Sequence, residues 1–135
     1  MTNQLEDIKV NVKIKISALW AALMFAYSYA DVLGFYSPGN LAEILTGEIA
    51  GVPLTPEMLF AMAILMGVPI VMVFLSLLLM PKVNRILNII AGIVYIVVLG
   101  ATFLGPLTPY YLVLASIEIV CLVLIVWFAF KWPKQ

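Results

Sequence analysis

Four long runs of apolar residues constrain this chain more than any other feature of its sequence. They cover residues 16–33, 58–80, 86–104 and 107–130. Each is close to or above the roughly 20 residues that a helix needs to cross a hydrocarbon layer about 30 Å thick. Inside such a layer, a separate segment can satisfy its backbone hydrogen bonds only as a helix. The runs therefore predict an all-α fold, a four-helix transmembrane bundle that runs up and down.

The composition agrees with a membrane-embedded chain. Of the 135 residues, 65% are hydrophobic and 10% are charged, and the mean hydropathy is +1.17. Soluble domains have about 45–50% apolar and about 25% charged residues. We therefore expect a single transmembrane domain over residues 1–135. The net charge is zero, so no basic surface for nucleic acid is predicted.

Two residue types are scarce enough to exclude whole classes of chemistry. The chain has no histidine, and Cys121 is its one cysteine. Intrachain disulfides, Cys/His zinc sites, histidine-held haem and a Ser-His-Asp mechanism all need residues that this sequence does not supply. No nucleophile stands with a base, so we expect no cofactor and disfavour an enzyme.

The charges predict how the bundle is oriented. An up-down topology places every lysine and arginine on one side of the membrane, namely Lys9, Lys13, Lys15, Lys82, Arg85, Lys131 and Lys134. The other side carries only Glu43, Glu48 and Glu57. By the positive-inside rule, both termini are cytoplasmic. We also expect two aromatic belts at the membrane faces. The inner belt consists of Trp20, Trp127 and Trp132, and the outer belt consists of Tyr36, Tyr110 and Tyr111.

Two segments outside the spans carry their own signals. The stretch "IKVNVKIKI" alternates as a strand does, but a lone strand beside a bilayer has no partner, so residues 1–15 are expected to extend the first helix at the interface. The outer loop, residues 34–56, contains "LAEILT", a short helix with Asn40 as a possible cap and Gly47 at its end. This loop is expected to lie as a lid over the outer end of the bundle.

Three stretches together point to a family. "LEDIKVNVKIKISALW", "VMVFLSLLLMPKVNRILNII" and "VWFAFKWPKQ" resemble a family of small prokaryotic four-helix membrane proteins known only as a domain of unknown function. The resemblance extends over residues 5–135, and its most specific part is the turn "PKVNRILN". It implies the same fold and the membrane of a prokaryotic cell. It brings no activity, ligand or catalytic residue.

Glu118 is the residue most suggestive of function. It lies about 20 Å above the inner belt and about 13 Å below Pro109, near the middle of the fourth span. A charged side chain at that depth costs at least about 2.5–3.5 kcal/mol, and such residues often mark ion or proton pathways. The other interpretation is a neutral carboxyl group that holds two helices, or two copies of the chain, together by a hydrogen bond.

Asp31 in the first span lies within about 5 Å of the depth of Glu118. Tyr27 and Ser28 precede it by one turn on the same face and can donate hydrogen bonds. If the first and fourth spans face each other, these residues share a cavity that opens to the outside. Alternatively, Asp31 is simply hydrated at the interface.

The second span contains two further patterns. Met58, Met62 and Met66 recur every four residues, and such thioethers could conduct Cu(I), although methionine more often only fills space. We therefore expect no metal site. Pro69 removes the hydrogen bond to the Leu65 carbonyl and is expected to kink the helix.

Asn88, Gly92 and Gly100 are spaced by multiples of four along the third span. Small residues let helices approach closely, so this face is expected to pack, either within the bundle or between copies. We therefore expect a homo-oligomer, most simply a dimer. Asn84, Arg85 and Asn88 could bind a lipid phosphate or cap a neighbouring helix, and the capping role is favoured.

These residues favour two molecular roles. The first is a transport or ligand-binding bundle for a proton, a small cation or an amphipathic solute, built on Glu118 and Asp31. The second is a structural or accessory membrane subunit in which Glu118 is a hydrogen-bonded strut. The first predicts a polar cavity beside Glu118, and the second predicts a donor packed against it.

Overall fold

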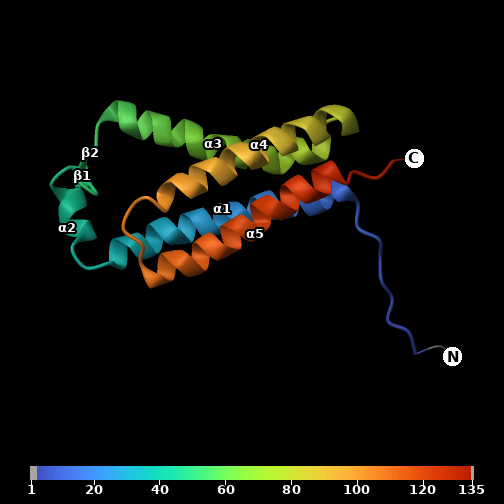
Figure 1. Ribbon diagram of the computed structural model, residues 1–135, viewed down its shortest axis with the longest axis horizontal. Coiled ribbons are helices and arrows are strands. Elements are labelled where there is room, and N and C mark those ends of the chain that lie inside the picture. The colour runs from blue at the N-terminus through green and yellow to red at the C-terminus, as the bar shows by residue number, and fades with distance from the viewer. Residues whose placement is uncertain (1–2, 135) are drawn as a thin grey trace.

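The computed structural model describes residues 3–134, and four long helices dominate it (Figure 1). In chain order, the elements are α1 (Val12–Tyr36), α2 (Asn40–Leu45), β1 (Glu48–Ile49), β2 (Val52–Pro53), α3 (Pro56–Leu78), α4 (Pro81–Thr102) and α5 (Pro109–Phe130). Helices α1, α3, α4 and α5 are long and apolar enough to cross a membrane. The expected all-α fold with four such helices and a short helix between the first two is confirmed.

Local sequence signals start each long helix. The Asn11 side chain accepts a hydrogen bond from the Lys13 N–H at 2.9 Å, and the Thr55 hydroxyl accepts one from the Met58 N–H at 3.2 Å. Helices α3, α4 and α5 have proline in their first turn, where its missing N–H costs nothing. Helix α4 therefore begins at Pro81, earlier than the apolar run that starts at residue 86.

The four long helices form an open bundle, in which some neighbouring helices pack along their length and others hardly touch. Helix α1 lies along both α5 and α3, and α4 lies along α5. Helices α3 and α4 are joined by a short turn and contact each other sparsely. In Figure 1 they lie together at this turn and move apart toward their other ends. The space between their diverging ends belongs to the site described below.

The core lies where α1, α4 and α5 meet. Ile16, Trp20 and Leu23 of α1 and Leu122 and Ile125 of α5 are fully buried. Most other large apolar side chains of the long helices face outward. Such a surface suits lipid and would be unfavourable in water.

The N-terminal segment differs from its expected conformation. Of the expected helical extension, only Val12–Lys15 belongs to α1; residues 3–11 are not helical, and residues 1–2 lie outside the described part. The reason is Asn11, whose extended backbone (ψ 142°) and side-chain hydrogen bond start the helix there. The segment leads away from the bundle in Figure 1.

The outer loop forms a small structure beside α1. Helix α2 and the two-residue strands β1 and β2 follow one another, and Ala50 and Gly51 both adopt positive φ in the hairpin turn. The Glu43 carboxylate accepts a hydrogen bond from the Gly51 N–H at 2.7 Å. Among the described elements outside the loop, only α1 contacts it, and no residue of α2 is buried. The expected lid over the bundle is therefore wrong.

Trp20 is also displaced from its expected place. Its indole is fully buried, and its N–H donates to the Asn88 side-chain oxygen at 2.7 Å. It belongs to the core and not to an interfacial belt. Trp127, by contrast, is 53% exposed, as an interfacial tryptophan would be.

Candidate functional site

Glu118 is buried on the inward face of α5. The buried residues Ala115, Glu118, Leu122 and Ile125 recur at helical spacing along this face, so the carboxyl group occupies a core position. Glu118 is 1% exposed, and neither of its carboxyl oxygens has a hydrogen-bond partner within residues 3–134. A buried polar group without a partner is rare and costly. The Glu118 carboxyl group, expected near the middle of its span, therefore makes no hydrogen bond in the described chain.

A cavity of about 260 Å³ adjoins this carboxyl group. All four long helices contribute to its wall. Its polar lining consists of Tyr27, Asp31, Tyr95, Thr102, Tyr111 and Glu118. The rest of the wall is apolar and includes Leu65, Met66 and Leu99. The cavity therefore combines two carboxyl groups and several hydroxyl groups with a largely hydrophobic surface.

The α1 residues of the expected site occupy different positions. Tyr27 lines the cavity, and its hydroxyl is buried without a hydrogen-bond partner in the described chain. Asp31 lines the cavity but is exposed, which places its carboxyl group at the mouth. Ser28 is exposed and does not line the cavity. Helix α1 thus presents Tyr27 inward, Asp31 at the entrance and Ser28 outward.

The charge around the cavity is one-sided. No lysine or arginine lines it in the described residues, so nothing there neutralises Asp31 and Glu118 by a fixed positive charge. Two carboxylates in a poorly solvated space disfavour each other's charged form. The arrangement therefore favours a proton or a cationic group as the counter-charge.

Tyr95 on α4 explains how the chain accommodates Pro69. Proline has no N–H, so the Leu65 carbonyl one turn earlier in α3 lacks its usual helical donor. The Tyr95 hydroxyl donates a hydrogen bond to this carbonyl. The Tyr95 ring also packs edge-on against Trp20, with centroids 6.0 Å apart. Pro69 therefore lies within α3 as expected, and its freed carbonyl fixes a tyrosine at the cavity wall.

From the sequence, Tyr111 was expected only as a member of an outer aromatic belt, and Thr102 was not singled out; both line the cavity. The Tyr111 hydroxyl donates to the Thr102 hydroxyl at 2.6 Å, and that group donates to the Leu99 carbonyl at 2.6 Å. This chain of hydrogen bonds links the end of α4 to the start of α5 along one side of the cavity. Spacing could not have found it, because the two residues are close only across the α4–α5 turn.

A second buried polar cluster is, by contrast, well paired. It consists of Trp20, Ser76, Asn84 and Asn88. The Asn88 oxygen accepts from Trp20 and from the Ser76 hydroxyl, and its amide donates to the Asn84 side chain at 2.6 Å. The Asn84 amide donates to the Ser76 carbonyl at 2.7 Å. Because its polar groups find partners, this cluster holds α1, α3 and α4 together and offers no free ligand group.

Arg85 takes the capping role expected of this region. Its guanidinium donates to the carbonyls of Ala129 at 3.1 Å and Phe130 at 3.2 Å, the last residues of α5. Carbonyls in the last turn of a helix lack the usual donor four residues on, and a cation there also suits the helix dipole. The contact ties the start of α4 to the end of α5.

The glycine pattern divides in two. Gly92 lies so close to α5 that an added Cβ would be 2.5 Å from a Val126 methyl group. Gly100 is exposed, and nothing lies within 4 Å of an added Cβ. Steps of four residues rotate by about 40° each, so the buried face of α4 continues through Tyr95 and Leu99. The three residues therefore do not share one packing face.

The methionine pattern is divided in the same way. Met66 lines the cavity, whereas Met58 and Met62 do not, and Met62 is 39% exposed. The three thioethers therefore do not surround a common path. Within residues 3–134, no group of three or more His, Cys, Asp or Glu side chains is placed to hold a metal ion.

The fold and the cavity together define a class: a small bundle of four membrane-length helices with an acidic, partly apolar internal cavity. Comparison with known proteins adds the family. A family model described as a family of unknown function (DUF6326) matches residues 5–135, and the chain belongs to this family. No curated protein matches the chain, and no solved structure matches it.

Proposed function

We propose that the chain is a multi-pass membrane protein that binds, and moves across part of the bilayer, a proton or a small cationic solute at Glu118. The observation that carries this proposal is the Glu118 carboxyl group, buried beside a cavity with both oxygens unpaired. A cation or a proton would supply the binding partner that these two oxygens lack in the described chain. Asp31 at the mouth attracts the same charge.

The lining of the cavity supports a small solute with both polar and apolar parts. Tyr27 offers a free hydroxyl beside the carboxyl group, and Leu65, Met66 and Leu99 offer apolar contact. Binding sites for small molecules commonly combine an apolar wall with a few convergent polar groups. The cavity volume of about 260 Å³ restricts the solute to a small one.

The alternative role, a structural strut, requires a hydrogen-bond donor for Glu118. Among the tyrosines that line the cavity, Tyr95 and Tyr111 donate elsewhere, to Leu65 and Thr102. The Tyr27 hydroxyl is free but makes no hydrogen bond to Glu118. A carboxyl group with a purely structural role would also be expected to pack against other side chains and not beside a cavity. The binding and transport role therefore has the stronger support.

The proposed location is the cytoplasmic membrane of a prokaryotic cell, with both termini inside. It rests on the apolar helices and on the seven cations, which the up-down order of the helices gathers at one end. A homo-dimer is the proposed assembly, with Gly100 as the small exposed residue available for close contact.

Glu118→Gln tests the proposal, because it keeps the shape and hydrogen-bonding capacity of the side chain but removes its titration. Purified protein in vesicles carries an internal pH-sensitive dye, and flux is driven by an imposed pH gradient or by tetraethylammonium. We expect the wild type to move protons or to exchange them for the organic cation. We expect the Glu118→Gln variant to insert normally and its flux to be at least about tenfold lower than that of the wild type.

Glu57→Gln is the matched control, since it removes an acid on the same side of the bundle that does not line the cavity. Its flux should equal that of the wild type. If Glu118→Gln keeps full flux and tetraethylammonium binding while only Glu118→Leu disturbs folding, the carboxyl group is a strut and the proposal fails.

A further inference from the structure

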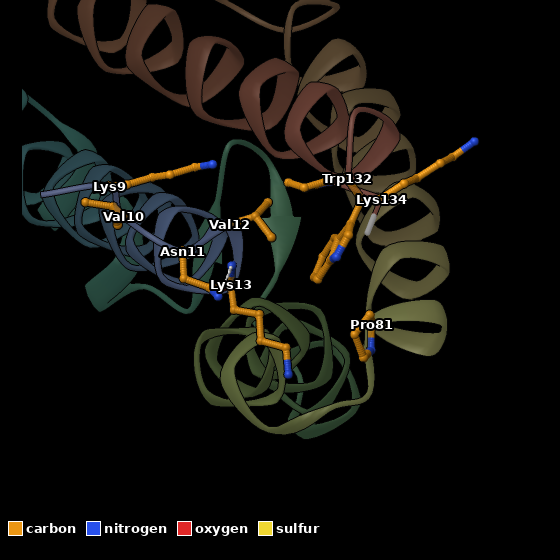
Figure 2. Close-up of a pocket in the computed structure, with 9 residues that line it drawn as sticks. Lys9, Val10, Asn11, Val12, Lys13, Pro81, Trp132 and Lys134 are labelled. Carbon is orange, nitrogen blue, oxygen red and sulfur yellow. Dashed lines mark hydrogen bonds between the residues drawn. The ribbon is translucent and has the colours of Figure 1, made fainter.

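The opposite end of the bundle carries a second feature, in addition to the Glu118 cavity. Two adjoining hollows of about 650 and 440 Å³ lie there and share the residues Pro81, Trp132, Pro133 and Lys134. Figure 2 shows the first hollow, with the N-terminal segment on one side and Pro81 and Trp132 on the other. We call the two together the basic groove.

Five cations line the basic groove. Lys9 comes from the N-terminal segment and Lys13 from the first turn of α1, Lys82 and Arg85 come from the start of α4, and Lys134 follows α5. No acidic residue lines either hollow in the described part of the chain. Because Arg85 already binds the carbonyls of Ala129 and Phe130, the four lysines remain for a ligand. Such a concentration of like charge favours an anion.

The walls between these cations are apolar. Val10 and Val12 line the first hollow, and Ile86 and Ile89 line the second. The two isoleucines lie in the second and third turns of α4, on the way from its start toward its middle. An anion bound at the lysines would therefore have a hydrophobic path beside it. An acyl chain would bury apolar surface against these side chains, which is favourable, whereas a soluble phosphate compound has no apolar chain to bury there.

We propose that the basic groove binds the phosphate group of an acidic phospholipid, whose acyl chain lies along Ile86 and Ile89. The lysines supply the charge, and the groove lies where the membrane-length helices end, at the depth of lipid headgroups. Trp132 lies between the two hollows, and a tryptophan at this level contacts both headgroup and chain. The proposal is independent of any transport at Glu118.

Trp132 gives the proposal a direct measurement. The experiment uses the full chain in detergent micelles with Trp127→Phe, because Trp20 is buried and Trp127 lies outside the groove. Brominated phosphatidylglycerol and brominated phosphatidylcholine are added separately, and quenching of tryptophan emission is followed. We expect the acidic lipid to quench at a mole fraction lower by on the order of tenfold.

Two double variants with the same charge change locate the site. Lys9→Gln with Lys13→Gln removes two groove lysines, which should raise the required mole fraction of phosphatidylglycerol on the order of tenfold. Lys15→Gln with Lys131→Gln removes two lysines outside the groove, which lie over the rings of Phe128 and Trp127, and should leave it unchanged. Helical circular dichroism verifies that each variant is folded.

Three outcomes would overturn the proposal. Equal quenching by the two brominated lipids would show that headgroup charge is not recognised. Equal loss in the two double variants would reduce the effect to net charge. Displacement of phosphatidylglycerol by glycerol phosphate at the same concentration would assign the groove to a soluble phosphate ester and remove the role of the acyl chain.

Discussion

Glu118, Tyr27 and Tyr95 line the same cavity but differ in whether their polar atoms have partners. Tyr95 donates to a carbonyl, whereas the Tyr27 hydroxyl and both Glu118 oxygens have no partner in the described chain. Unpaired groups in native structures often belong to functional sites. Tyr95 therefore shapes the cavity, whereas the polar atoms of Tyr27 and Glu118 are available to a ligand.

The role of Tyr95 can be tested against Pro69. In Tyr95→Phe the Leu65 carbonyl loses its donor, so the free energy of unfolding should fall by about 0.5–1.5 kcal/mol. Pro69→Ala restores a backbone N–H one turn after that carbonyl. In the Pro69→Ala background, Tyr95→Phe should therefore cost clearly less. The free energies of unfolding of the four proteins in this double-mutant cycle are measured in mixed micelles.

An equal cost of Tyr95→Phe in both backgrounds would contradict the link, because the carbonyl would then not depend on proline. Tyr111→Phe provides a control. Its hydroxyl bonds to Thr102, away from Leu65, so its effect should not change with Pro69.

At the scale of single residues, the sequence predicted that Glu118, Tyr27 and Asp31 share a cavity, but not the other polar residues that line it. The apolar run around Glu118 predicts its depth in the span, and the spacing from Tyr27 to Asp31 predicts their relative height on α1. The place of Tyr95 and Tyr111 in the cavity wall was not predicted, because it depends on the lateral packing of α4 against α3 and α5. Ser28 was placed one turn from Asp31 correctly, yet the rotation of α1 directs it outward.

At the scale of elements, the close contact of α4 with α5 depends on Gly92. Gly92→Ala would place a methyl group 2.5 Å from Val126, so the helices must separate or shift. We expect the free energy of unfolding to fall by about 1–3 kcal/mol. Within a single copy of the chain, Gly100→Ala meets nothing within 4 Å and improves helix propensity, so at protein concentrations too low for a dimer it should be neutral or stabilising by up to about 1 kcal/mol.

The same unfolding measurement in mixed micelles compares the two variants. Similar losses for Gly92→Ala and Gly100→Ala would contradict the assignment of Gly92 to the α4–α5 contact. A loss at Gly100 that depends on protein concentration would instead place Gly100 between two copies of the chain.

The existence of each long helix was predictable, whereas its ends and its rotation were less so. Hydropathy specifies a span, but Pro81 starts α4 because a proline suits a first turn, so the helix includes the polar residues before the apolar run. At the N-terminus, the alternation of "IKVNVKIKI" is typical of a strand, whereas the absence of a pairing strand favoured a helix. The side chain of Asn11 decided the outcome by starting α1 at Val12.

At the scale of the whole molecule, the proposed orientation can be tested by labelling. The native Cys121 is buried and is replaced by alanine, after which single cysteines are introduced as Ser37→Cys or Lys134→Cys. A membrane-impermeant maleimide applied to intact cells should label position 37 and not position 134, because the positive-inside rule places the chain ends in the cytoplasm. Permeabilised cells, in which both should react, are the control.

Labelling at position 134 in intact cells would invert the orientation. The cavity mouth at Asp31 would then face the cytoplasm, and the basic groove would face the outside. The internal geometry of the Glu118 site would be the same in either case.

The wide contact of α1 with α5 has a consequence for biogenesis. Helix α1 leaves the ribosome before α5, so it is made before one of its two main neighbours. At about 5–20 residues per second the interval lasts several seconds. A chain that stops before α5 leaves core side chains such as Trp20 without their surroundings. Completion of α5 thus supplies the surroundings that bury the core side chains of α1.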